Sequence, residues 1–189
     1  HVFVRSNCLR SGGVMGRSVD FESGSTQWIS CETATGPYTD ITDYPISLCA
    51  WVKMESDPGS MSVLGIYDTT ADNVYQEIRI DTTAPSAAAV SRGGGGTFSA
   101  VGATTLVVGI WYHLTAVFLN KTDRKIYLNA VQDGSNITSA LFIACDSSAC
   151  GRLNRSSPTL YYDGLISHAQ IYDTNLSTAQ MSAIMADPS

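Results

Sequence analysis

Residues 111–129 read Trp-Tyr-His-Leu-Thr-Ala-Val-Phe-Leu-Asn-Lys-Thr-Asp-Arg-Lys-Ile-Tyr-Leu-Asn, and this stretch decides the fold class. Residues 112–119 alternate in the manner of a strand, and residues 125–129 place Ile126 and Leu128 on one face of a second strand. The polar segment 120–124 between them has the composition of a turn. The sequence therefore predicts a β-hairpin, the clearest one in the chain.

Short segments with a two-residue alternation occur on both sides of this hairpin. Such alternation is typical of antiparallel sheets with one face in water. The predicted strands are residues 46–53, 62–67, 74–80 and 165–172. In the last of these strands, one face is expected to carry Leu165, Ser167, Ala169 and Ile171.

Two segments depart from this pattern. Residues 82–96 contain Pro85, a run of alanines and four consecutive glycines, a composition that is costly to order and predicts a long, mobile surface loop. After residue 172 the apolar period changes from two to nearly four, which predicts a short helix over residues 177–186. Ser177 and Gln180 form a Ser-x-x-Gln capping box at the start of this helix.

The length and charge of the chain limit its domain number and its partners. Its 189 residues are expected to form one domain, residues 1–189, with a core over about residues 17–187. The net charge is −6 and no basic cluster is present, so nucleic acid is not an expected partner. No apolar run is long enough for a membrane span. Because the chain begins at His1 without a Met, it is expected to be part of a larger multidomain protein or assembly.

Five segments carry motifs that occur together in one family. Residues 17–22 look like its opening strand, and residues 45–53 contain an apolar-Ser-x-Ala-Trp-Val-Lys motif. A Trp-x-His-x-x-x-Val motif begins at residue 111, a Leu-Tyr-x-Asn type of strand follows at 125–129, and a closing strand and short helix follow at 162–177. In this order the segments resemble the laminin-G-like jelly-roll domain of the concanavalin A-like lectin and glucanase superfamily. The resemblance implies an all-β fold, a two-sheet antiparallel jelly-roll sandwich with a short C-terminal helix.

Two positions depart from the pattern of that family. Ala130 stands where the family commonly has Gly, so the turn there is expected to differ. Ser167 stands where the closing strand commonly has an Asp that in some members helps to hold a structural calcium ion. No cofactor or metal site is therefore predicted, although structural calcium stays compatible with the acidic loops. The loop carboxylates that could supply oxygen ligands are Asp40, Asp43, Asp68, Asp72 and Asp163.

The fold does not settle the activity, because this superfamily includes hydrolases as well as binding modules. Its retaining glucanases carry two glutamates on one strand, with the carboxyl groups roughly 5–5.5 Å apart. The glutamates of this chain, all on separate segments, are Glu22, Glu32, Glu55 and Glu77. Glu77 with Asp81 is the nearest approach to a pair. His113 and His168 have no accompanying nucleophile motif and are expected to be structural. The sequence therefore favours a protein that is not an enzyme.

A lectin-like site needs an exposed aromatic face for the apolar side of a sugar, surrounded by amide, carboxylate or guanidinium groups. One loop and its adjoining strands offer this mixture. The candidate carbohydrate-binding residues are Tyr67, Asp68, Asn73, Tyr75, Arg79 and Arg92. The two tyrosines are expected at the rim of the sandwich with their hydroxyl groups in water. A second, weaker candidate combines Tyr38 and Tyr44 with Asp40 and Asp43, whereas the core is expected to hold Trp28, Trp51 and Trp111.

The cysteines show no zinc-type spacing. Cys145 and Cys150 flank a short loop that could close as a disulfide in an oxidising compartment, or both could remain thiols. Cys49 is expected to be a buried thiol, and the pairing of Cys8 and Cys31 stays open. Asn-x-Ser/Thr sequons, all expected on turns and loops, begin at Asn120, Asn136, Asn154 and Asn175.

These observations together favour a non-catalytic recognition module that binds carbohydrate. Two alternatives stay open: a structural or protein-interaction module, as in adhesion or on a virion or phage surface, and a glycoside hydrolase or lyase of the same fold. The expected partner is accordingly a glycan or a surface protein. The expected location is extracellular or at the surface of a particle.

Overall fold

The computed structural model describes residues 3–4, 18–32, 43–82, 84–93, 95–142 and 144–186. The strands in these ranges are β1 (Phe3–Val4), β2 (Val19–Phe21), β3 (Ile29–Glu32), β4 (Ile46–Met54), β5 (Met61–Tyr67), β6 (Val74–Asp81), β7 (Ser86–Gly93), β8 (Thr97–Val101), β9 (Trp111–Asn120), β10 (Asp123–Leu128), β11 (Val131–Asn136), β12 (Ser147–Cys150) and β13 (Gly164–Tyr172). The helices are the one-turn 3-10 helix η2 (Ser23–Ser25) and α1 (Thr178–Ala186). Neither helix is long and apolar enough to cross a membrane.

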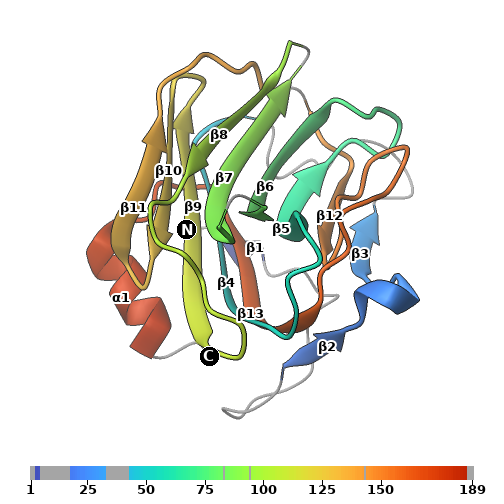
Figure 1. Ribbon diagram of the computed structural model, residues 1–189. Coiled ribbons are helices and arrows are strands. Elements are labelled where there is room, and N and C mark those ends of the chain that lie inside the picture. The colour runs from blue at the N-terminus through green and yellow to red at the C-terminus, as the bar shows by residue number, and fades with distance from the viewer. Residues whose placement is uncertain are drawn as a thin grey trace.

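The strands form two antiparallel sheets that face each other (Figure 1). The seven-stranded sheet has the order β1-β13-β4-β9-β10-β11, and β2 also pairs with β13. The six-stranded sheet has the order β3-β12-β5-β6-β7-β8. The predicted all-β sandwich of two antiparallel sheets with a short C-terminal helix is confirmed.

The alternation seen in the sequence determines which side chains enter the core. In β4 the even-numbered side chains, from Ile46 to Val52, point between the sheets and are buried. Ile78 and Ile80 of β6 point into the same space from the opposite sheet. Burying apolar side chains from both inner faces is the main source of stability in a sandwich of this kind.

Helix α1 packs on the outer face of the seven-stranded sheet. Leu176 and Met181 contact Cys49 and Val117 there, and these side chains form a small apolar cluster of their own. The predicted capping box is confirmed, because Ser177 N donates to Gln180 Oε1 at 2.9 Å and Gln180 N donates to Ser177 Oγ at 3.3 Å.

The prediction of a mobile loop over residues 82–96 is wrong for most of that segment. Residues 86–93 form β7, an interior strand of the six-stranded sheet between β6 and β8. Ala87 and Ala89 point into the core, whereas Ala88 and Val90 lie on the other face, and all four are buried. Alanine has a low intrinsic preference for strands, but hydrogen bonding to a strand on each side outweighs it here.

The face predicted for the closing strand is also wrong. A register shift between Ser167 and Gln170, where His168 has a φ of +49°, changes the alternation within β13. Ile166 and Ile171 consequently both point into the core, although they are five positions apart and regular alternation would place them on opposite faces. A bulge of this kind turns later side chains to the opposite face.

The turn between β10 and β11 keeps the backbone conformation that glycine adopts most easily. Asn129 and Ala130 have φ angles of +50° and +63°. This pair of left-handed residues is the pattern of a tight hairpin turn. The turn was expected to differ because Ala130 replaces a glycine, but the chain instead places alanine in a strained conformation.

Candidate functional site

The candidate residues from β5, β6 and β7 meet on the outer face of the six-stranded sheet, the face that points away from the other sheet. In β6, Tyr75, Glu77 and Arg79 point to this outer face because the alternate residues enter the core. Tyr75 lies opposite Tyr67 of β5 on one side and Arg92 of β7 on the other. The sheet register thus brings together residues that are up to 25 positions apart in the chain.

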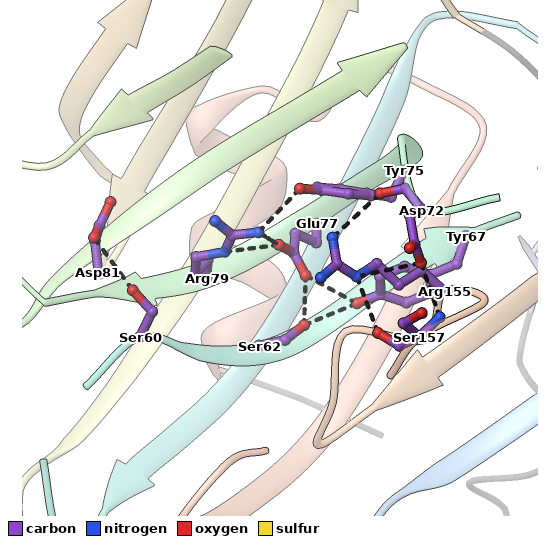
Figure 2. Close-up of polar contacts among 10 residues, drawn as sticks. All are labelled: Ser60, Ser62, Tyr67, Asp72, Tyr75, Glu77, Arg79, Asp81, Arg155 and Ser157. Atoms are coloured by element: carbon purple, nitrogen blue, oxygen red, sulfur yellow. Dashed lines mark hydrogen bonds and ion pairs between the residues drawn. The ribbon is translucent and has the colours of Figure 1, made fainter. Parts of the chain in front are cut away.

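Glu77 is the centre of a polar cluster on the outer face (Figure 2). Its side chain is 0% exposed and forms an ion pair with Arg79, in which Arg79 Nε donates to Glu77 Oε1 at 2.8 Å. The other carboxylate oxygen accepts from Ser62 Oγ at 2.5 Å and from the Tyr67 hydroxyl at 3.2 Å. Both oxygens are therefore occupied by donors of the protein itself.

Arg79 connects this cluster to Tyr75. Its guanidinium carbon lies 5.8 Å from the centre of the Tyr75 ring, and Nη2 donates to the Tyr75 hydroxyl at 3.4 Å. Burial lowers the pKa of Arg79, but the charge of Glu77 and the contact with Tyr75 outweigh that effect, so the pKa is raised overall. Burial, together with the charge of Glu77, also raises the pKa of the Tyr67 hydroxyl. Arg79 is thus always charged and held in one orientation.

The expectation that Tyr67 and Tyr75 lie at an exposed rim is wrong. Tyr67 is 0% exposed and Tyr75 is 2% exposed. The two rings lie 6.3 Å apart and pack in one apolar cluster with Leu153 and Leu160. A ring that is covered in this way offers no face on which a sugar could stack.

The segment between β12 and β13 provides this cover. Ser62 N donates to the carbonyl oxygen of Leu160 at 2.8 Å, which fixes the segment to β5. Asp72 fixes its other part, because Asp72 Oδ1 accepts from Ser156 Oγ at 2.6 Å and from Ser157 N at 2.8 Å. Arg155 adds an ion pair with Asp72 at 3.7 Å. A segment about 80 residues away in sequence thus covers the two tyrosines.

The remaining candidate residues, Asp68, Asn73 and Arg92, differ in whether their polar groups are accessible to a ligand. Asp68 accepts from the backbone and side chain of Thr70, so it shapes the turn after β5. Asn73 is exposed at the start of β6. Arg92 is half-buried and lies between Tyr75 of β6 and Thr97 of β8. Of the six predicted residues, Asn73, Arg79 and Arg92 keep the polar groups most suited to an external ligand.

The carboxylates on the outer face are not arranged as a hydrolytic pair. Glu77 and Asp81 are four residues apart on β6, which at roughly 3.3 Å per residue separates them by about 13 Å. Retaining glycosidases need about 5–5.5 Å between the carboxyl groups and inverting ones about 6.5–9.5 Å. Asp81 interacts instead with Ser60, as Figure 2 shows.

The two histidines lie on the seven-stranded sheet, away from the outer face described above. His113 is buried against the edge of Trp51, with ring centres 5.4 Å apart, and burial lowers its pKa to about 4. Nδ1 of His168 lies 2.6 Å from the hydroxyl of Ser167. These contacts fit the structural roles expected for both side chains.

Two tryptophans that were expected in the core are exposed instead. Trp28 is 44% exposed and Trp111 is 38% exposed, whereas Trp51 is half-buried. The guanidinium of Arg152 lies 3.7 Å from the ring centre of Trp28 and also bonds Asn154. The polar run Glu-Ser-Gly-Ser-Thr-Gln before Trp28 was the available signal that this residue lies outside a strand with a buried face.

The predicted disulfide between Cys145 and Cys150 is not formed. Cys150 is a free thiol, and both side chains point into the main core. Burial raises the pKa of Cys150 to about 12, so the thiolate needed for disulfide exchange is disfavoured. Cys49 is a buried thiol as expected, and burial raises its pKa to about 12 as well. Cys8 and the side chain of Cys31 lie outside the described residues.

Only half of the second candidate site, Tyr44 and Asp43, lies in the described part of the chain. Tyr38 and Asp40 lie outside the described residues. The Tyr44 ring packs edge-on against Phe142 at 5.4 Å, and its hydroxyl donates to the carbonyl oxygen of Ala140 at 3.2 Å. Asp43 is exposed and accepts from the backbone of Tyr44.

In the part of the chain that the structure describes, three exposed carboxylates could together hold a metal ion. Asp20, Glu22 and Glu55 bring their oxygen atoms within 4.8 Å of one another. These residues were not predicted as metal ligands from the sequence, because Asp20 and Glu22 are far along the chain from Glu55. Among the loop carboxylates named from the sequence, Asp163 already accepts hydrogen bonds from Ser23 N, at 3.0 Å, and from Ser56 Oγ.

The fold defines the class of this protein. It is a jelly-roll β-sandwich of the type found in lectins and carbohydrate-binding domains. A laminin-G-type family model, described as the concanavalin A-like lectin/glucanases superfamily, matches residues 23–182. The chain belongs to this superfamily, which confirms the resemblance drawn from its motifs. No curated protein matches the chain in sequence.

Solved structures with the same fold include two domains bound to carbohydrates and a pentraxin. The CBM40 of the Ruminococcus gnavus IT-sialidase, bound to α2,3-sialyllactose, has a TM-score of 0.70 at 13% identity, covering 89% of this chain and 96% of that one. A heptameric SAP-like pentraxin from Limulus polyphemus has a TM-score of 0.66 at 15% identity, covering 88% and 80%. Domain 4 of an extracellular arabinanase from Geobacillus stearothermophilus, in complex with arabinotriose, has a TM-score of 0.66 at 21% identity, covering 91% and 78%. At these identities the likeness shows the fold.

Proposed function

We propose that this chain is a non-catalytic carbohydrate-binding module that holds its ligand on the outer face of the six-stranded sheet. One observation carries the proposal. Arg79 and Arg92 stand on adjacent strands of that face, one fixed by a buried carboxylate and the other without a hydrogen bond or ion pair in the described chain. The superfamily and the carbohydrate-bound domains of the same fold support it.

A sheet face of this kind suits sugar hydroxyl groups. Side chains that project from a sheet are held by the strands beneath them, so their donors are oriented before a ligand arrives. Arg79 is oriented further by Glu77, whose own oxygen atoms are fully occupied. The exposed amide of Asn73, immediately before the first residue of the strand that holds Arg79, adds both a donor and an acceptor.

The proposal excludes glycoside hydrolysis because, among the described residues of this face, no second carboxylate lies at a catalytic distance from Glu77. Glu77 is not placed to act as a nucleophile, because its side chain is 0% exposed and pairs with Arg79. Asp81 is too distant for either glycosidase geometry. Binding without cleavage is the function that these groups can support.

The proposal extends to the context in which the chain works. We place it on a secreted or particle-surface protein, as one module of a larger polypeptide or assembly. This context is consistent with the similarity to a domain of an extracellular arabinanase. Locating the native protein by fractionation of its source, with an antibody against this chain, tests the context separately from binding.

A glycan array probed with the purified chain tests the function directly. We expect binding to at least one glycan, in the high-micromolar to millimolar range of a shallow site, which corresponds to roughly 4–6 kcal/mol. Each bound glycan and a panel of polysaccharides should also be incubated with the protein and assayed for new reducing ends. Absence of binding across the array would contradict the proposed function, and release of reducing sugar would contradict its non-catalytic part.

A further inference from the structure

Arg92 has an unusual environment for a charged side chain. It is half-buried on β7, an interior strand of the six-stranded sheet, and no hydrogen bond or ion pair satisfies its guanidinium in the described chain. Partly buried arginines in folded proteins are normally paired, because the loss of hydration is otherwise not offset. Arg79, Arg124 and Arg155, which are also half-buried or buried, all have such partners.

Among the described residues, those around Arg92 offer no acidic partner. The residues opposite it are Tyr75 on β6 and Thr97 on β8, and its neighbour on the same face of β7 is Val90. Glu77, opposite Val90, is the nearest carboxylate in the register of the sheet, but Arg79, Ser62 and Tyr67 already occupy its oxygen atoms. The chain as a whole has a net charge of −6, so this unpaired cation is a local exception to the charge of the protein.

We infer that the ligand of the outer face is a glycan that carries a carboxylate, and that Arg92 binds this group. A guanidinium has donors in a planar fork that matches a carboxylate with two parallel hydrogen bonds. Thr97 and Ser99 of the neighbouring strand β8 lie on the same face as Arg92 and can bond sugar hydroxyl groups. This inference rests on the proposed function and names the class of ligand for the same site.

Arg79 cannot replace Arg92 in this role. Glu77 already neutralises Arg79 and holds its Nε and Nη2 atoms. Arg92 is therefore the cation on these two strands whose charge is available to an anion. A charge-assisted pair favours an acidic glycan over the matching neutral one by about 10- to 100-fold, because a hydrogen bond to a charged group contributes about 1.5–3 kcal/mol.

The test compares glycans that differ in whether they carry a free carboxylate. Affinities of the chain should be measured by isothermal titration or ligand-observed NMR for α2,3-sialyllactose against lactose, and for trigalacturonate against its methyl ester. The first pair represents sialic acids and the second represents uronic acids, so the two arms distinguish the two sources of the carboxylate. We expect at least tenfold tighter binding of the acidic member in one of the pairs.

Three variants connect this preference to the residue. Arg92→Ala should lose the preference for the acidic glycan, and Arg92→Lys should keep part of it because the charge remains without the fork. Lys53→Ala is the matched control, since it removes one positive charge from β4 of the opposite sheet and should leave the affinity unchanged. Thermal melting of all three variants shows whether a loss of binding reflects unfolding.

The possible results separate this inference from the proposed function. Equal affinity for acidic and neutral members, or an unchanged preference in Arg92→Ala, would overturn the assignment of Arg92 while leaving glycan binding in place. If the array and both pairs show no binding at all, the proposed function fails together with the inference. Tighter binding of one acidic glycan that Arg92→Ala abolishes and Lys53→Ala does not would support it.

Discussion

Replacing Arg79 with Met should destabilise the protein strongly, because it leaves the charge of Glu77 buried without its counter-ion. Glu77 is 0% exposed and Arg79 is 13% exposed in their side chains. Removing one partner of a buried ion pair costs about 3–5 kcal/mol of unfolding free energy. For a chain of 189 residues this corresponds to a fall in melting temperature of about 6–20 °C, at roughly 2–4 °C per kcal/mol.

Removing both charges should cost much less. In the double variant Glu77→Met and Arg79→Met, no charge remains buried, and the new side chains meet the apolar surroundings of Tyr67 and Tyr75. Ser62 Oγ and the Tyr67 hydroxyl still bond each other at 2.9 Å, so neither loses its last partner. We expect the double variant to be within about 2 kcal/mol of the parent, as found for other buried ion pairs replaced by apolar groups.

Urea denaturation at pH 7, followed by fluorescence and circular dichroism, measures these differences. Arg92→Met is the matched control, because it makes the same replacement on the same sheet face but breaks no ion pair, and it should cost less than about 1 kcal/mol. If Arg79→Met were as stable as Arg92→Met, or if the double variant were less stable than Arg79→Met, the ion pair would not have the stabilising role assigned to it.

Three further predictions concern other parts of the molecule. Ala130→Gly should stabilise the protein by about 0.5–1 kcal/mol, since glycine adopts the left-handed backbone at this turn without strain, and a urea melt with a higher midpoint checks it. His113 is held neutral, with a folded pKa of about 4 below its unfolded value of about 6.5, so the unfolded state gains the proton first as the pH falls. The parent should therefore lose about 2 kcal/mol more stability than His113→Gln between pH 7 and pH 5, and equal losses would contradict this. Of the sequons, the exposed Asn120 and Asn175 should be glycosylated on secretion from a eukaryotic host, whereas the buried Asn154 should not, as peptide mass mapping would show.

The fold was predictable because its signals are local and repeated. The alternation in residues 46–53 decides which side chains of β4 enter the core, and the same holds for β6 and β9. The helix was predictable for a similar reason, since Ser177 and Gln180 contact each other across one turn. Such patterns depend on neighbours in the chain and need no knowledge of distant segments.

The candidate site was predictable only in part. Tyr67, Tyr75, Arg79 and Arg92 do share one sheet face. The alternation within β5 and β6 implies this for the first three residues, but not for Arg92, because β7 was expected to be a loop. Their exposure could not be inferred, because Leu153 and Leu160 cover the tyrosines from a segment far along the chain. The alanine-rich segment that forms β7 was wrongly predicted as a loop. Its composition is typical of a loop, but it forms an interior strand because β6 and β8 both hydrogen-bond to it.

The sequence by itself determined the class of fold, the strands with strong alternation and the capped helix at the end of the chain. Tertiary structure alone decided which polar groups of the outer face are paired within the described protein and which are not. The carboxylate of Glu77 became the buried partner of Arg79 because β5 brings Ser62 and Tyr67 against it, and Arg92 was left unpaired because no acidic side chain stands opposite it. The physical reason is that alternation assigns a residue to one face of its own strand, whereas its burial and its partners depend on which strands and loops fold against that face.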